Sequence, residues 1–213
     1  MMHIFQHLAL EPYEPRGIIH SEMALIIYIA QRLEIERFIE SGRARAQSTY
    51  ILAKYLPDIE IHSIEMREGE DADFGRQRIA NMRNVTCHSG DGSVLVSWLV
   101  ERSQERTAIL CDGPKGAAAV TILEKCFEYQ HVMAGFIHDM RKLDHGQPSP
   151  HRACAAERLP HHRFSDDPRY VEGMSWMDAN VVAAGGPVGP QHEATYGSYG
   201  PTLGVFVNPK NQN

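Results

Sequence analysis

The stretch IERFIESGRARAQSTYILAKY, residues 35–55, decides the fold predicted for this chain. An apolar run through Phe38 and Ile39 predicts a buried strand over residues 37–40. A tight turn follows, because small residues recur at Gly42, Ala44 and Ala46. The turn leads into a helix predicted over residues 48–56, whose inner face would carry Ile51, Leu52, Tyr55 and Leu56. The first N–H groups of such a helix have no partner within it and its dipole favours negative charge, so the turn predicts a cradle for an anion or a cofactor.

Strands and helices alternate regularly from this stretch to residue 139. Further strands are predicted over residues 60–65, 85–88, 107–111 and 131–137. Helices are predicted over residues 71–82, 93–104 and 117–129, and another, with Ser21 as its cap, precedes them over residues 20–34. The alternation predicts an α/β fold with a doubly wound, mostly parallel, Rossmann-like sheet that has helices on both faces. We expect the strand order 3-2-1-4-5, with a C-terminal strand, residues 202–207, joining antiparallel near strand five.

The domain organisation is predicted to be simple, because the sequence contains no internal repeat and no linker. We expect one domain over residues 1–213, with an N-terminal arm over residues 1–17. Residues 140–168 are rich in Pro, His and Arg and lack periodicity, so they are predicted to form an irregular cap. A helix over residues 169–180 and a Gly/Pro-rich loop over residues 183–201 would follow the cap.

Composition and charge restrict the classes of function. Hydrophobic residues make up 43% and charged residues 23% of the chain, as in an ordinary globular domain. The net charge of -6 gives no bulk support for sequence-independent DNA binding. The four cysteines are widely spaced and are predicted to be reduced core thiols. The apolar run at residues 23–30 is too short to cross a membrane, and the N-terminus lacks a signal-peptide pattern. We therefore expect a cytoplasmic protein without a strong nucleic-acid or membrane signal, whose oligomeric state stays open.

Polar side chains follow each of the five predicted strands at its carboxyl end. In an open α/β sheet, ligands bind outside this edge. A carboxylate or imidazole at every strand end therefore predicts that the functional site lies there, and the residues concerned are Glu40, Glu65, Asp91, Asp112, His138 and Asp139.

This arrangement resembles a class I S-adenosylmethionine-dependent methyltransferase over residues 36–139 and the final strand. Residues 40–49, ESGRARAQST, stand at the position of that family's acidic, glycine-rich first motif, with Ala44 and Ala46 in place of its second and third glycines. Glu65 stands where the family binds the ribose hydroxyls, Gly90-Asp91 where it contacts adenine, and residues 112–115, DGPK, where it faces the substrate. The resemblance implies S-adenosylmethionine as cofactor and methyl transfer to a small-molecule O or N nucleophile. The cofactor-binding residues that it implies are Glu40, Ser41, Gly42, Ala44, Ser48, Glu65 and Asp91.

The residue chemistry agrees with this assignment and also leaves a second cofactor open. A carboxylate such as that of Glu65 accepts hydrogen bonds from both hydroxyls of a ribose diol. Glu65 follows Gly42 at about the 20-residue spacing of dinucleotide-binding folds, so NAD is a competing ligand. The chain has no GxGxxG motif, and S-adenosylmethionine, which lacks a pyrophosphate, demands less of the glycines.

The ends of strands four and five are predicted to carry the chemistry, through Asp112, His138 and Asp139. Neighbouring parallel strands lie about 4.8 Å apart, so these side chains can converge on one atom. They would either hold Mg²⁺ or Mn²⁺, as in a subset of small-molecule O-methyltransferases, or act without metal, with His138 as general base and Asp112 orienting the acceptor.

Two other functions remain open at this stage. Arg43 and Arg45 place two cations in the first motif, so a methyltransferase-fold protein that binds another anionic ligand without methyl transfer is one alternative. A metal-assisted sugar- or antibiotic-modifying enzyme on the same scaffold is the other.

Overall fold

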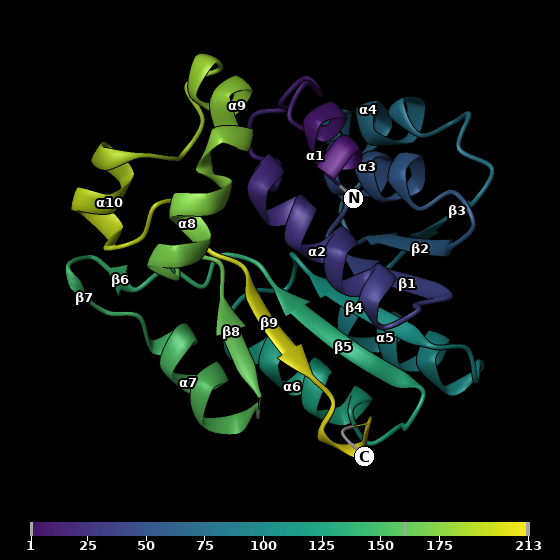
Figure 1. Ribbon diagram of the computed structural model, residues 1–213. Coiled ribbons are helices and arrows are strands. Elements are labelled where there is room, and N and C mark those ends of the chain that lie inside the picture. The colour runs from purple at the N-terminus through teal and green to yellow at the C-terminus, as the bar shows by residue number, and fades with distance from the viewer. Residues whose placement is uncertain (1, 160, 212–213) are drawn as a thin grey trace.

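Seven strands form one mixed sheet with the order β3-β2-β1-β4-β5-β9-β8 in the computed structural model, which describes residues 2–159 and 161–211 (Figure 1). Strands β1 to β5 are parallel to their neighbours, β9 is antiparallel to β5, and β8 is antiparallel to β9. The strands are β1 Arg37–Ser41, β2 Glu60–Glu65, β3 Val85–Ser89, β4 Thr107–Cys111, β5 Val132–Ile137, β8 His162–Phe164 and β9 Gly204–Val207.

The predicted sheet is confirmed in class, strand order and the antiparallel C-terminal strand. The bounds of β1 to β5 agree with the prediction to within one residue at each end. The C-terminal strand begins at Gly204, two residues later than predicted, because Thr202 has a left-handed backbone with φ of 72° that interrupts the extended conformation.

Helices cover both faces of the sheet, as predicted (Figure 1). The sequence alternation of β1 directs Phe38 toward the core beneath α2, His20–Arg32, and α3, Gln47–Tyr55. The next residue, Ile39, enters the opposite core beneath α5, Gly92–Glu101, and α6, Ala117–Cys126. All five residues of β1 and of β4 are buried, which explains why these strands lack an alternating polar pattern.

The segment after β5 contains more regular structure than its sequence predicts. It includes the hairpin of β6, Leu143–Asp144, and β7, Gln147–Pro148, followed by α7, Pro150–Arg158, and the edge strand β8. The helix predicted over residues 169–180 is divided into α8, Pro168–Met174, a 3-10 turn, Ser175–Asp178, and α9, Ala179–Ala183, and the predicted loop contains α10, Pro190–Tyr196. These elements are short and depend on tertiary contacts, so periodicity does not reveal them.

The structure describes only part of the residues covered by the arm and domain predictions. The arm contains α1, Met2–Leu8. Helix α4, Glu70–Arg78, is not part of the arm and lies beside α3 (Figure 1). Residues 1, 160, 212 and 213, which the arm, cap and domain predictions include, lie outside the described residues. The division into one domain with an arm and a cap stays a prediction.

Two local predictions are wrong. Ser21 lies inside α2 and does not cap it; its backbone N–H and hydroxyl instead donate to Asp178 at 2.9 and 2.7 Å. Cys87 is exposed, because it lies on the uncovered edge strand β3, whereas Cys111 and Cys126 are buried as expected.

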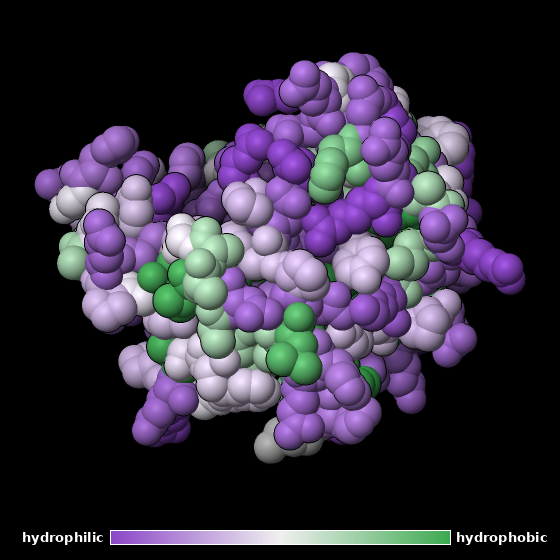
Figure 2. Space-filling view, turned by 90° about the horizontal axis from the view of Figure 1, so that it is seen from above, coloured by the Kyte–Doolittle hydropathy of each residue, from purple (hydrophilic) through white to green (hydrophobic). Residues whose placement is uncertain are grey.

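The surface seen from above has mostly hydrophilic side chains, with hydrophobic ones in small separate groups (Figure 2). No helix in the described part of the chain has the length and apolar character needed to cross a membrane. The predicted cytoplasmic location stays a prediction.

Candidate functional site

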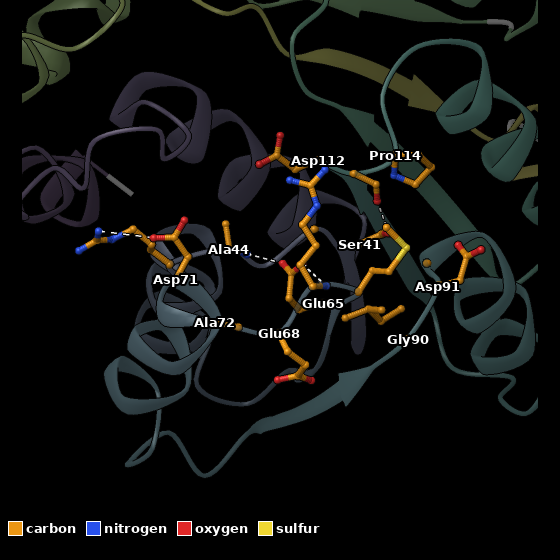
Figure 3. Close-up of a pocket in the computed structure, with 18 of the residues that line it drawn as sticks. Ser41, Ala44, Glu65, Glu68, Asp71, Ala72, Gly90, Asp91, Asp112 and Pro114 are labelled. Atoms are coloured by element: carbon orange, nitrogen blue, oxygen red, sulfur yellow. Dashed lines mark hydrogen bonds and ion pairs between the residues drawn. The ribbon is translucent and has the colours of Figure 1, made fainter.

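A cavity of about 1040 Å³ opens at the carboxyl edge of the sheet, where the loops after β1, β2, β3 and β4 meet (Figure 3). Six residues of the predicted site line it, namely Ser41, Gly42, Ala44, Glu65, Asp91 and Asp112. The other four predicted residues, Glu40, Ser48, His138 and Asp139, are not part of the lining.

The turn after β1 has the conformation that a glycine-rich loop would adopt. Gly42 has φ of 96°, and the two alanines also lie in the left-handed region, Ala44 with φ of 42° and Ala46 with φ of 59°. A Cβ on Gly42 would lie 2.6 Å from the backbone nitrogen of Gly113, so only glycine fits between the β1 and β4 loops. The alanines therefore keep the shape of the turn at a cost in backbone strain.

Glu40 is fully buried behind this turn. Its carboxylate accepts hydrogen bonds from the hydroxyls of Ser48, Thr49 and, at 2.7 Å, Ser63. Burial raises the pKa of Glu40, although the three hydroxyl hydrogen bonds oppose that change. Glu40 and Ser48 thus join β1 to the start of α3 and to β2, and they lie outside the cavity.

Glu65 lies at the centre of the cavity residues, between Ala44 on one side and Ser41 and Asp91 on the other (Figure 3). Its Oε2 accepts the backbone N–H of Ala44 at 2.7 Å, and its Oε1 accepts that of Arg67 at 2.9 Å. Each carboxylate oxygen has two lone pairs, so one on each oxygen remains available to a ligand hydroxyl.

Asp91 begins α5 at the next strand end. Its Oδ1 accepts the backbone N–H and the hydroxyl of Ser93, both at 2.8 Å, and these hydrogen bonds lower the pKa of Asp91. A second carboxylate therefore stays ionised in the cavity lining, next to the end of β1.

Ionic groups converge at the ends of β4 and β5. His138 Nδ1 lies 2.8 Å from Asp112 Oδ1, and its Nε2 lies 3.3 Å from the buried carboxylate of Glu22 on α2. The ammonium of Lys115 contacts Asp112 Oδ1 and lies 2.8 Å from Asp139 Oδ2. Two cationic and three anionic side chains thus alternate in one chain of contacts.

These contacts fix the charge states. Burial disfavours a charged His138, but the carboxylates of Asp112 and Glu22 outweigh burial and raise the pKa of His138 to about 10. Burial also opposes a charged Asp112, yet His138 and Lys115 lower the pKa of Asp112 to about 2. For the same reason, against burial, the pKa of Lys115 is raised by Asp112 and Asp139.

The metal predicted for this cluster does not fit the donors as they are arranged. One ligand atom each of Asp112, His138 and Asp139 lies within 4.8 Å of the others, as a metal site requires. However, Asp112 Oδ1 accepts from both His138 and Lys115, and the ring nitrogen of His138 that would bind a metal faces a carboxylate as a donor. A divalent ion would have to displace the Lys115 ammonium and the His138 proton.

No family model and no curated protein matches the chain. Solved structures do match: the O-methyltransferase from Bacillus cereus in complex with SAH has a TM-score of 0.57 at 15% identity, over 97% of this chain and 89% of that one. The O-methyltransferase TomG from Streptomyces achromogenes, in complex with SAM and involved in tomaymycin synthesis, has 0.55 at 15% identity, over 90% and 82%. Cofactor-bound Rv0187 from MTB has 0.58 at 13% identity, over 97% and 87%.

The fold is that of the class I S-adenosylmethionine-dependent methyltransferases. The two arginines that set this methyltransferase fold apart in its first motif both have protein partners. Arg43 is buried and donates to the carbonyl of Ser63 at 2.8 Å, pointing away from the cavity. Arg45 lines the cavity, but its Nε lies 2.7 Å from Glu14 of the N-terminal arm and its guanidinium stacks on Phe74 of α4. Arg43 is therefore outside the cavity lining and Arg45 is paired with a carboxylate, so neither arginine presents an unpaired charge to the cavity.

The arm closes one side of the cavity. Arg16 donates to both carboxylate oxygens of Asp71 on α4, at 3.2 and 3.1 Å (Figure 3). Glu14 of the arm also forms ion pairs with Arg45 and, at 3.3 Å, with Arg78 of α4.

Sequence reasoning missed Glu22 and the Arg16–Asp71 pair as parts of the site, and it assigned no contact to Lys115. A signal existed for Glu22, because it lies four residues before Ile26 on the apolar face of a helix, where a charge needs a partner. Lys115 follows Asp112 by three residues within the DGPK segment, which places it in the site without indicating its contacts.

Proposed function

We propose that the protein is a S-adenosylmethionine-dependent methyltransferase that acts on a small-molecule oxygen or nitrogen nucleophile. The observation that carries the proposal is the Glu65 carboxylate, held at the centre of the cavity by the N–H groups of Ala44 and Arg67 with lone pairs to spare. A carboxylate so placed suits a ribose diol.

The charge of the cavity favours this cofactor over NAD. The lining contains six acidic side chains and four basic ones, which are Glu65, Glu68, Glu70, Asp71, Asp91 and Asp112 against Arg16, Arg45, Arg67 and Lys115. An acidic excess suits a ligand with a sulfonium and an ammonium group and disfavours the pyrophosphate of a dinucleotide.

The residues that would hold the cofactor follow from their places around the cavity. Glu65 would bind the ribose hydroxyls, Asp91 lies at the adenine end, and the backbone of Ser41, Gly42 and Ala44 would line the amino-acid end. When bound, the cofactor supplies an electrophilic methyl group, so the protein's main task is to position the acceptor.

Asp112 is the side chain best placed to orient the acceptor. Its contacts with described side chains all use Oδ1, and its side chain lines the cavity. Oδ2 can therefore accept a hydrogen bond from the O–H or N–H of the acceptor and aim that atom's lone pair at the methyl group. His138 lies behind Asp112 and holds it in place.

Calorimetric titration of the full chain with S-adenosylmethionine, S-adenosylhomocysteine and NAD tests the proposal. We expect saturable binding of the first two at one site per chain and no binding of NAD. Binding of NAD alone would replace the methyltransferase with a dinucleotide enzyme, and binding of none of the three would contradict the cofactor assignment.

A further inference from the structure

The ammonium of Lys115 occupies the space between the carboxylates at the ends of β4 and β5. We propose that Lys115 is the built-in cation of this site and fills the position in which a divalent metal ion would otherwise bind. The inference deepens the proposed function, because it concerns the acceptor end of the same cavity.

Two carboxylates from different strands converge on the one nitrogen atom. Asp112 follows β4 directly, and its Oδ1 contacts Lys115 Nζ. Asp139 comes two residues after β5 and has a left-handed backbone with φ of 63°. Its Oδ2 lies 2.8 Å from the same Nζ. Lys115 reaches both from the loop between β4 and α6, and these two carboxylates are the oxygen ligands that a metal at this place would require.

The third ligand position is also taken. His138 Nδ1 lies at hydrogen-bond distance, 2.8 Å, from Asp112 Oδ1, and its Nε2 lies 3.3 Å from the Glu22 carboxylate. A ring nitrogen that donates to a carboxylate offers no lone pair to a metal, so Nδ1, the nitrogen that faces the carboxylates of the cluster, is already engaged. His138 is 5% exposed and Glu22 is 1% exposed, so both members of this pair are buried from water.

Electrostatic repulsion opposes the binding of both cations together. A divalent ion bound to Asp112 and Asp139 would lie within a few ångströms of the Lys115 ammonium in a half-buried site, where charges are weakly screened. The lysine is part of the chain and has an effective concentration that no dissolved ion matches. We therefore expect the internal ammonium to exclude the metal.

The arrangement also bears on the acceptor. Lys115 has three N–H donors, and among the described residues its partners are Asp112 and Asp139. The remaining N–H is available at the cavity wall, since Lys115 lines the cavity and its side chain is 43% exposed. It suits an acceptor with a single oxygen atom, whereas a metal would select a chelating pair of oxygens.

Binding of Mn²⁺ alone to the full chain, followed by electron paramagnetic resonance, tests the proposal without substrate or cofactor. The wild-type protein should show no saturable Mn²⁺ binding up to about 1 mM, the weak end of protein sites for hard cations. Lys115→Met removes the ammonium and keeps the chain length, so it should bind Mn²⁺ at least about tenfold more tightly than the wild type. Lys115→Arg keeps a cation and should behave as the wild type.

A double variant shows whether any Mn²⁺ that Lys115→Met binds is held by the carboxylates of this site. Adding Asp139→Asn to Lys115→Met should remove the Mn²⁺ affinity, because it removes one of the two oxygen ligands. Micromolar Mn²⁺ binding by the wild type, or no gain in folded Lys115→Met, would overturn the proposal. If circular dichroism shows that Lys115→Met is unfolded, Lys115→Gln takes its place in the same comparison. Failure of the cofactor titration leaves this result unaffected, so the two proposals fail separately.

Discussion

The Glu65 carboxylate accepts backbone hydrogen bonds from two loops, through Ala44 and Arg67. If it also holds the ribose, Glu65→Ala removes two charge-assisted hydrogen bonds, each worth roughly 1.5–3 kcal/mol. S-adenosylmethionine should then bind at least about tenfold more weakly, since 1.4 kcal/mol corresponds to one decade. Calorimetry measures this change, and Asp58→Ala, which removes an exposed carboxylate in the α3–β2 turn, is the matched control. Unchanged affinity in folded Glu65→Ala would remove Glu65 from the site.

The charge on His138 should make the protein less stable as the pH rises into the alkaline range. Its pKa is raised from 6.5 to about 10, so its stabilising charge is fully present below pH 6.5 and is lost as the pH rises through about 10. The lowered pKa of Asp112 arises from the same interaction with His138, so it adds no separate contribution to the stability. Between pH 6.5 and 10 the wild type should lose roughly 2–5 kcal/mol more unfolding free energy than His138→Asn. Urea unfolding at both pH values measures the difference, and parallel losses in the two proteins would refute a charged His138.

At this scale the sequence predicted which residues reach the sheet edge and missed how they pair. Glu65, Asp91 and Asp112 line the cavity because each lies at or just beyond the carboxyl end of a parallel strand. The apolar pattern reveals the buried strands β2 and β4. Glu40 lies equally close to such an end, yet three hydroxyls hold it in the core. Those hydroxyls come from α3 and β2, and their approach is decided by packing, which has no period in the sequence.

The contact between α4 and the β1 turn depends on one glycine. A Cβ on Gly75 of α4 would lie 2.5 Å from the carbonyl oxygen of Ala44, a backbone atom that cannot swing away. Gly75→Ala should therefore push α4 from the turn and destabilise the fold by roughly 1–3 kcal/mol. Cofactor affinity should fall with it, because the first residues of α4 line the cavity.

Gly173 provides the matched control for this substitution. It lies in α8, is exposed and has no atom within 4 Å of a built Cβ. Gly173→Ala should leave the stability unchanged or raise it by roughly 0.5–1 kcal/mol, as alanine does in helix interiors. Urea unfolding compares the two variants, and equal effects would mean that α4 does not press on the turn.

Elements with a long apolar pattern were predicted well and short ones were not. The helices α2, α3, α5 and α6 and the strands β1, β2, β4 and β5 carry apolar residues that face a core on one or both sides. Helix α7 has Ala155 as its single buried residue, so its sequence has no stripe to detect.

A largely buried ion pair holds separate segments of the C-terminal third together. Arg152 of α7 donates to both oxygens of Asp166, which follows β8, and Asp166 also accepts the hydroxyl of Ser198 near α10. Arg152→Ala leaves Asp166 buried with one cation fewer and should cost roughly 2–4 kcal/mol of unfolding free energy.

Arg158 on the same helix is the control, because its partner Glu124 and its own side chain are about one-third exposed. Arg158→Ala should cost much less than Arg152→Ala, since water replaces an exposed pair. Thermal unfolding ranks the two variants, and an equal loss would show that Asp166 does not hold the C-terminal third together.

The ion pair between Arg16 and Asp71 is too weak to control how fast the cavity fills and empties. Both side chains are largely exposed, and such pairs contribute at most about 1 kcal/mol, which corresponds to a roughly fivefold ratio of closed to open arm. The arm tip therefore detaches too readily to trap a bound molecule, so we expect contacts inside the cavity to limit the release of a ligand. Stopped-flow association rates should accordingly change by less than about fivefold between low salt and 1 M salt, where the Debye length is about 3 Å. A larger change would mean that the arm acts as a gate.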